Sequence, residues 1–284
     1  MYLLISGEFV FFYWLSALVL GAYISFRYVP TFSTWVQTVT YLYAGKNSVV
    51  QILCSSAILL IVLGKDYNSR FSIVKWAYIL FAFVMTFLLR GRTAILSTVI
   101  AISVFVLSSK GNTKKRVTFV VIVCVILIAI ISDDSLNLIV RHALGLDTYQ
   151  SIDLDRFSSG RLTLYKNAID LFASNWLIGV GDYYVDNFYI NSITTLGIIG
   201  GGPLILMWVV RIIMIIRNFK KNPKNLICVA SMTLSVFYFI ESLLEAYPPF
   251  GPGSCSFMFW LLCGLSDSGF CLLEGESVKK QLTS

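Results

Sequence analysis

The stretch FSIVKWAYILFAFVMTFLLRGRTAILSTVIAISVFVLSSK, residues 71–110, decides the fold class. It contains two long apolar runs, Phe71–Leu89 and Thr93–Ser108, which the turn Arg90-Gly91-Arg92 separates. A helix needs about 20 largely apolar residues to cross the hydrocarbon core of a bilayer, and both runs come near this length. The pattern therefore predicts two membrane-spanning helices joined by a short basic turn.

The same pattern recurs along the chain. Apolar residues make up 57% of it and charged residues only 13%, against about 25% charged residues in a soluble domain. This composition excludes a soluble enzyme, a disordered chain and a disulfide-stabilised secreted scaffold. We expect an all-α polytopic membrane protein, one integral membrane domain over residues 1–284, with eight spans. The six further runs are Val10–Phe26, Val49–Gly64, Val117–Ser132, Ser192–Ile216, Leu226–Leu244 and Ser256–Leu273.

The connections between the runs alternate in charge. Thirteen of the 22 lysines and arginines fall on one side and eight on the other, and Arg211 lies inside a run. Short basic loops stay in the cytoplasm, so we expect both termini there and assign the net charge of +7 to topology rather than to nucleic-acid binding. We expect no cleavable signal at the N-terminus. Gly200–Pro203 predicts a short outer helix, a break and then a span from Leu204, and the Gly197–Gly202 cluster predicts either close helix packing or a break in the span.

Residues 133–191 form one long outer connection, and loops of this length usually carry function. Within it, residues 158–174 predict a helix that Ser158 or Ser159 caps. Its polar face holds Thr163, Lys166, Asn167, Asp170 and Ser174. Arg161 falls on the opposite side with Leu164, Tyr165, Ala168 and Phe172. A charge there needs a partner, which is either a ligand anion or an internal group, unless the side chain snorkels to water.

Arg90 and Arg92 lie in the outer turn after Leu89, close to the large loop that carries Arg156 and Arg161. Guanidinium groups suit phosphate because they donate paired hydrogen bonds. These four arginines therefore predict a cationic pocket for an anionic lipid head group such as a diphosphate.

Two carboxylates and several aromatic residues add to this outer site. Glu241 and Glu245 are one helical turn apart near the outer end of their span. They either serve function or form a salt bridge with an outer arginine. Trp176, Tyr183, Tyr184 and Tyr189 either stack on sugar rings or belong to the interfacial aromatic belt. One histidine and six cysteines without a C-x-x-C pair predict no metal site and no cofactor.

The segment Ser158–Leu206 resembles the core of the O-antigen ligase and repeat-unit polymerase superfamily. The resemblance rests on an S-G-R start, a G-x-G turn, an Asp-Asn pair followed by aromatic residues, and G-I-I-G opening the next span. In this chain these are Ser159-Gly160-Arg161, Gly179-Val180-Gly181, Asp186-Asn187-Phe188-Tyr189 and Gly197-Ile198-Ile199-Gly200. Arg92-Thr93-Ala94 is similar to the family's arginine turn between two spans.

The resemblance implies an enzyme of the bacterial inner membrane with its active face periplasmic or extracellular. Its substrates would be glycans on undecaprenyl diphosphate, without nucleotide sugar, metal or cofactor, and a chain-length regulator is a further partner that it allows. Arg161 and Arg92 would stabilise the departing diphosphate, and Asp186 would be the base. Arg90, Arg156, Asn187, Tyr189 and Glu241 would contact substrate.

Two departures from the family pattern qualify this reading. Ligases of the family carry His where Asp186 stands, so we favour a polymerase over a ligase. Asp186 has a second interpretation, in which it holds a turn together with Asn187. The family commonly has more spans, which leaves open a short member or a chain lacking an N-terminal part. A ligase, a lipid-linked glycan transporter and a purely structural membrane protein remain as alternatives.

Overall fold

The computed structural model describes residues 46–63, 69–88, 91–108, 160–251 and 254–269. Every regular element within these ranges is an α-helix, so the all-α class is confirmed for them. The helices are α3 (Lys46–Leu63), α4 (Ser69–Leu88), α5 (Arg92–Ser108), α9 (Arg161–Ser174), α10 (Phe188–Lys221), α11 (Leu226–Leu244) and α12 (Ser254–Asp267). The predicted spans Val10–Phe26 and Val117–Ser132 lie outside the described residues, as do Arg90, Arg156 and His142.

The helix limits follow local capping residues. Helix α11 has the predicted limits, because Asn225 caps its start by accepting a hydrogen bond from the Ile227 amide at 3.1 Å. Helix α12 ends at Asp267 and not at Leu273 as predicted. The turn that follows contains Gly269 at a φ of 72°, a conformation that ends many helices and that favours glycine.

Two of the described helices, α10 and α11, are long and apolar enough to cross a membrane by length and composition. The apolar parts of α3, α4, α5 and α12 are shorter, so the arrangement with eight spans stays a prediction. Large aliphatic side chains, including Leu206, Val210 and Ile213, stand exposed along α10. An apolar face of this extent suits contact with lipid tails rather than with water.

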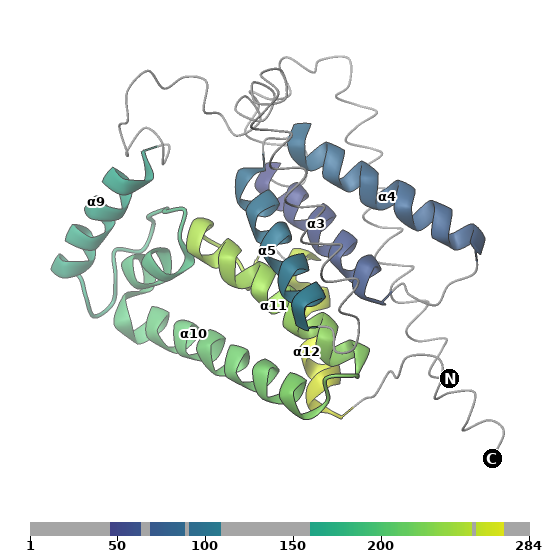
Figure 1. Ribbon diagram of the computed structural model, residues 1–284. Coiled ribbons are helices and arrows are strands. Elements are labelled where there is room, and N and C mark those ends of the chain that lie inside the picture. Colours follow the sequence, from purple (N-terminus) through teal and green to yellow (C-terminus); the bar gives the residue numbers. More distant parts are fainter. Residues whose placement is uncertain (1–45, 64–68, 89–90, 109–159, 252–253, 270–284) are drawn as a thin grey trace.

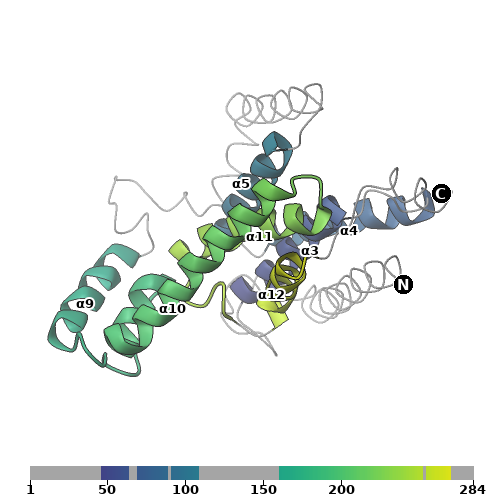
Figure 2. The same cartoon turned by 90° about the horizontal axis from the view of Figure 1, so that it is seen from below.

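Helices α3, α5 and α11 pack together at the centre, and α4 lies against α3 (Figure 1). Seen from below, α9, α10, α11 and α4 follow one another across the molecule (Figure 2). Helix α5 turns the small, fully buried residues Ala94, Ser97 and Ala101 toward this core. Small side chains let neighbouring backbones approach closely, so polar groups of α5 and α11 come within hydrogen-bonding distance.

Helix α10 is broken at Gly197, whose φ of 63° and ψ of −172° lie in a region open essentially only to glycine. A break within the Gly197–Gly202 cluster is therefore confirmed at its first glycine, whereas the predicted break at Gly200–Pro203 is wrong because the helix continues through these residues. The break separates a short outer helix from the long apolar part of α10. It also frees backbone groups on both sides of Gly197 for pairing with another segment.

The segment after α9 supplies the partners for these freed groups, and we call this arrangement the glycine interlock. Its four backbone hydrogen bonds run from Val180 to Thr194 (2.9 Å), Gly181 to Thr195 (3.0 Å), Ile198 to Trp176 (2.9 Å) and Ile199 to Leu177 (3.2 Å). A Cβ atom on Gly179 would lie 2.5 Å from the Thr195 carbonyl oxygen, so this close crossing requires glycine. The G-x-G and G-I-I-G motifs thus form one structural unit that fixes the chain leading to Asp186.

Candidate functional site

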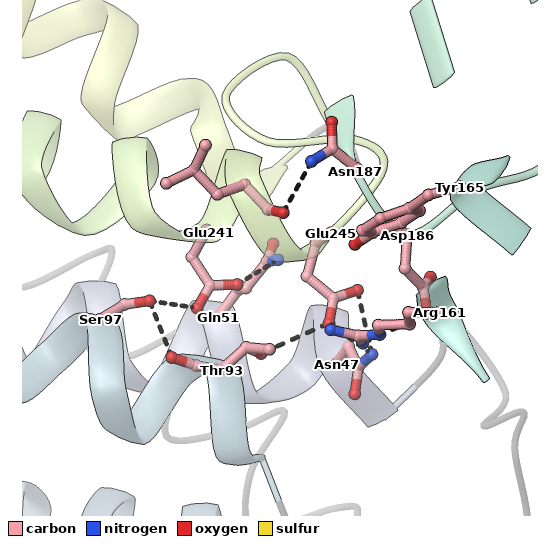
Figure 3. Close-up of polar contacts among 11 residues, drawn as sticks. Asn47, Gln51, Thr93, Ser97, Arg161, Tyr165, Asp186, Asn187, Glu241 and Glu245 are labelled. Carbon is pink, nitrogen blue, oxygen red and sulfur yellow. Dashed lines mark hydrogen bonds and ion pairs between the residues drawn. The ribbon is translucent and has the colours of Figure 1, made fainter. Parts of the chain in front are cut away.

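Five polar residues from separate parts of the chain meet at one end of the helix bundle, and we call them the arginine cluster (Figure 3). They are Asn47 at the start of α3, Thr93 at the start of α5, Arg161 at the start of α9, Asp186 before α10, and Glu245 after α11. The alternation of charge predicts that all five positions are on the outer side. Their convergence is what that topology requires of the described helices.

Arg161 is the centre of the cluster. Its Nη2 atom lies 3.2 Å from Asp186 Oδ2 and 3.5 Å from Glu245 Oε1, and its side chain keeps 20% of its surface exposed. Of the predicted alternatives for Arg161, pairing with an internal group is therefore the one that this structure shows. The guanidinium is only partly exposed, and a ligand can still contact its exposed part. The predicted cap is wrong: α9 begins at Arg161 after Gly160, which has a φ of 79° and makes no side-chain cap.

The orientation of α9 agrees with the predicted amphipathic pattern except at one position. Ala168 is fully buried, and Tyr165 and Phe172 are half-buried on the side of Arg161. Leu164 is exposed instead. The apolar side of α9 therefore packs on the first part of α10 and directs Arg161 toward the end of α11.

Glu245 connects the arginine to three central helices. It accepts hydrogen bonds from Asn47 Nδ2 at 3.0 and 3.1 Å, one to each carboxylate oxygen, and from Thr93 Oγ1 at 3.4 Å. Burial, and then the neighbouring Asp186 charge, raises the pKa of Glu245, while Arg161 and the two donors oppose this shift. The prediction that Glu241 or Glu245 forms a salt bridge with an outer arginine is confirmed for Glu245.

Asp186 directs its carboxylate to Arg161, and its main-chain carbonyl accepts a hydrogen bond from the Tyr165 hydroxyl at 2.7 Å. Burial raises the pKa of Tyr165, so this hydroxyl remains a donor at neutral pH. Asn187 caps the helix that follows this turn, and the Asp186 side chain also hydrogen-bonds to Tyr184. Asp186 is half-buried, so its carboxylate stays accessible beside the guanidinium.

Asn187 and Tyr189 are occupied by internal contacts. Asn187 caps α10 by accepting from the Ile190 amide at 2.9 Å and donates to the Leu243 carbonyl at 2.9 Å. The Tyr189 hydroxyl lies 3.2 Å from Ser242 Oγ and accepts from Trp208 Nε1 at 3.2 Å. These contacts favour structural roles for both residues over the predicted contact with substrate.

Glu241 is fully buried one turn before Glu245. Its carboxylate accepts hydrogen bonds from Ser97 Oγ and Gln51 Nε2, each at 2.9 Å (Figure 3). Both oxygens of the buried Glu241 carboxylate are hydrogen-bonded, and they join α3, α5 and α11. This geometry favours a structural role for Glu241 over the predicted contact with substrate. Its partners are single polar residues inside apolar runs, a signal that intramembrane polar sites commonly give.

Arg92 is the remaining predicted arginine that the structure describes. It is the half-buried first residue of α5 and precedes Thr93, which contacts Glu245. No carboxylate of the described residues forms an ion pair with it. Arg90 and Arg156 lie outside the described residues, so the predicted cationic pocket of four arginines stays a prediction.

Two exposed tyrosines border the arginine cluster. Tyr184 and Tyr247 face each other with ring centroids 5.9 Å apart. Tyr184 is among the aromatics predicted from the outer loop, whereas sequence reasoning did not single out Tyr247. Within the described residues, no group of three His, Cys, Asp or Glu side chains is arranged to hold a metal ion.

A different ion pair lies at the opposite end of the bundle. Arg211 of α10 pairs with Asp267 of α12, and its guanidinium lies 5.8 Å from the centre of the Trp260 ring. Asn218 also donates to Asp267, at 2.8 Å. Arg211 therefore links α10 to α12 and takes no part in the arginine cluster.

Comparison with protein families gives an independent result. Residues 77–195 match the family model described as O-antigen ligase, and a search of curated proteins found no match. The matched span includes Arg92, Arg161 and Asp186 but ends before Glu245. Proteins of this family are membrane-associated ligases and polymerases of glycosyltransferase type. Residues 77–195 are therefore similar to the O-antigen ligase and polymerase superfamily, and the match includes Ser158–Thr195 of the segment that carries the resemblance as well as the Arg92 turn.

Proposed function

We propose that the protein is a glycosyltransferase that polymerises oligosaccharide repeat units carried on undecaprenyl diphosphate. The product is a surface polysaccharide, either O-antigen or capsule, and the site faces the outside of the bacterial inner membrane. The observation that carries the proposal is the contact between Arg161 and Asp186. This contact supports the proposal because Asp186, the proposed base, lies beside a cation, and both residues belong to the span that matches the family model.

The proposed reaction is one glycosyl transfer. An oxygen of a hydroxyl group on the incoming unit forms a bond to the anomeric carbon of the growing glycan. The bond between this carbon and the diphosphate oxygen breaks, and its electron pair leaves with the diphosphate. The Asp186 carboxylate accepts the hydroxyl proton. Cations fixed where negative charge develops often give the largest catalytic contribution, and Arg161 and Arg92 fill this role.

The contacts around Arg161 support such a division of work. Glu245 is held by Asn47 and Thr93, so it anchors Arg161 to the central helices. Arg161 is then oriented before substrate arrives, and preorganised groups stabilise a transition state without reorganising during the reaction. Arg92 forms no ion pair with a carboxylate of the described residues, so we assign the direct contact with the diphosphate to it.

Cellular complementation tests this proposal. In a strain that lacks its own copy of this chain, Arg161→Ala and Asp186→Asn should reduce the glycan ladder to a single repeat unit. Lys166→Ala and Asp182→Asn are matched controls, because both side chains are exposed on the same outer segment and lie outside the cluster. If Arg161→Ala and Asp186→Asn both make long chains at normal protein levels, the site assignment is wrong.

A ligase is the second candidate function, and the description of the matched family favours it. Asp186, where ligases of the family carry histidine, favours the polymerase. The same strain separates the two functions. Loss of a ligase leaves long glycan on the lipid carrier, whereas loss of a polymerase leaves only single units. Loss of all surface glycan, including the single-unit form, would instead point to a transporter.

A further inference from the structure

Tyr184 and Tyr247 form an exposed aromatic pair that comes from two distant parts of the chain. The two residues are 52% and 53% exposed, and their ring centroids are 5.9 Å apart with ring planes inclined by 47°. The residues that follow Tyr184 and precede Tyr247, Val185 and Ala246, are buried. These buried neighbours anchor both backbones, so the two rings are presented from fixed positions.

The pair borders the arginine cluster on both sides. Tyr184 stands two residues before Asp186, and Tyr247 stands two residues after Glu245. Burial, then a hydrogen bond to the Asp186 side chain and the Asp186 charge, raises the pKa of Tyr184, so the phenol lies directly beside this carboxylate. A ligand lying on the two rings would therefore be beside the Arg161–Asp186 contact.

Neighbouring aromatic residues have a different role. Phe188 and Phe250 contact each other at 5.5 Å between centroids, and Phe250 stacks on Trp260 at 5.3 Å. These rings join α10 to α12 in the interior, whereas Tyr184 and Tyr247 each remain about half exposed. Trp176 is also exposed, at 55%, but has no ring contact with the described residues. It has the character of a single interfacial aromatic.

A sugar ring has the chemistry that fits such a pair. One face of a pyranose presents C–H groups, which carry partial positive charge, and the face of an aromatic ring carries partial negative charge. Tyrosine hydroxyls and the nearby carboxylate can also hydrogen-bond to sugar hydroxyls. Two inclined rings offer one contact for the sugar face and a second for its edge.

We infer that Tyr184 and Tyr247 form the platform on which a sugar ring of the glycan substrate lies, with its reacting carbon toward Arg161 and Asp186. This inference rests on the proposed function and names the part of the substrate that the site recognises. The platform binds the sugar equally before and during transfer. Its loss should therefore raise KM and leave kcat unchanged.

Steady-state transfer by the purified protein in proteoliposomes, with the lipid-linked repeat unit as substrate, tests the platform. Tyr184→Ala and Tyr247→Ala should each raise KM by roughly two- to tenfold, as expected for one aromatic contact, and Tyr247→Ala should retain kcat. Tyr247→Trp should hold KM or lower it, because the larger ring keeps the contact. Trp176→Ala is the matched control and should change neither constant. An unchanged KM in the Tyr184→Ala/Tyr247→Ala variant overturns the platform.

Binding without turnover separates this inference from the proposed function. The probe is the free repeat-unit oligosaccharide, followed by saturation-transfer NMR on the whole protein. Wild-type protein should bind it, and the double alanine variant should lose the signal while thermal unfolding stays unchanged. If wild type binds and transfers but the double variant is identical to it, only the platform fails. If wild type neither binds nor transfers, the proposed function fails.

Discussion

Replacing Gly197 with alanine tests whether the glycine interlock holds the outer loop in place. A residue other than glycine in this backbone conformation costs about 1–3 kcal/mol. The added Cβ would lie 2.3 Å from the Leu177 carbonyl oxygen, so the two segments must move apart. The hydrogen bonds from Ile198 and Ile199 would then lengthen or break, and each contributes about 0.5–1.5 kcal/mol. The free energy of unfolding should fall by about 2–6 kcal/mol.

Thermal unfolding in detergent measures this effect, and Gly202→Ala is the matched control. A Cβ on Gly202 meets only Ile198 Cγ1, at an ordinary 3.7 Å, and alanine stabilises a helix interior by about 0.5–1 kcal/mol relative to glycine. Gly197→Ala should lower Tm by at least about 4 °C, while Gly202→Ala holds it or raises it. Equal Tm values for the two variants would refute the reasoning about the interlock.

Three further outcomes follow from the site. Asn187→Ala should lower the free energy of unfolding by about 1–2 kcal/mol, because it removes the cap of α10. Asn187→Asp keeps a capping oxygen and should lower it less. Equal denaturation midpoints for these two variants would contradict the prediction. Burial, and then Asp186, raises the pKa of Glu245. The stabilising contribution of this residue is therefore full below its unfolded pKa of about 4.3 and is lost as pH rises. The Tm of Glu245→Gln minus the Tm of wild type should accordingly increase from acidic to neutral pH. A difference in Tm that stays constant over this pH range would contradict the prediction. An excess of EDTA should leave the transfer rate unchanged, because the proposed chemistry uses arginines and a carboxylate; inactivation that divalent cations reverse would show otherwise.

The sequence was sufficient to predict the elements whose signals are local. The limits of α11 follow from an apolar run between Asn225 and Glu245, and the amphipathic pattern of α9 placed Arg161 on its inward side. The sequence limited the break in α10 to Gly197–Pro203 but did not indicate which glycine forms it, because the conformation of Gly197 depends on the segment around Gly179. The contact between these two segments is tertiary, so the spacing of residues within α10 does not indicate it.

The partners of Arg161 show the same limit at the site. Asp186 and Glu245 were each singled out, and an ion pair between a glutamate and an outer arginine was one of the predicted readings. Which outer arginine pairs with Glu245 depends on how the ends of several helices meet in the folded protein, and the sequence does not show this. Asn47, Thr93, Ser97 and Gln51 were missed, although each is a polar residue at the edge or in the interior of an apolar run. Asn187 and Tyr189 were predicted to bind substrate, whereas their polar groups make internal contacts.

Joining of repeat units to one another can be observed with purified protein in proteoliposomes that contain the lipid-diphosphate-linked repeat unit as the sole glycan. We predict products that lengthen by whole repeat units, with release of the lipid diphosphate, and loss of these products in Asp186→Asn but not in Asp182→Asn. Products that form only after a second, separate acceptor glycolipid is added would contradict the claim and identify a ligase.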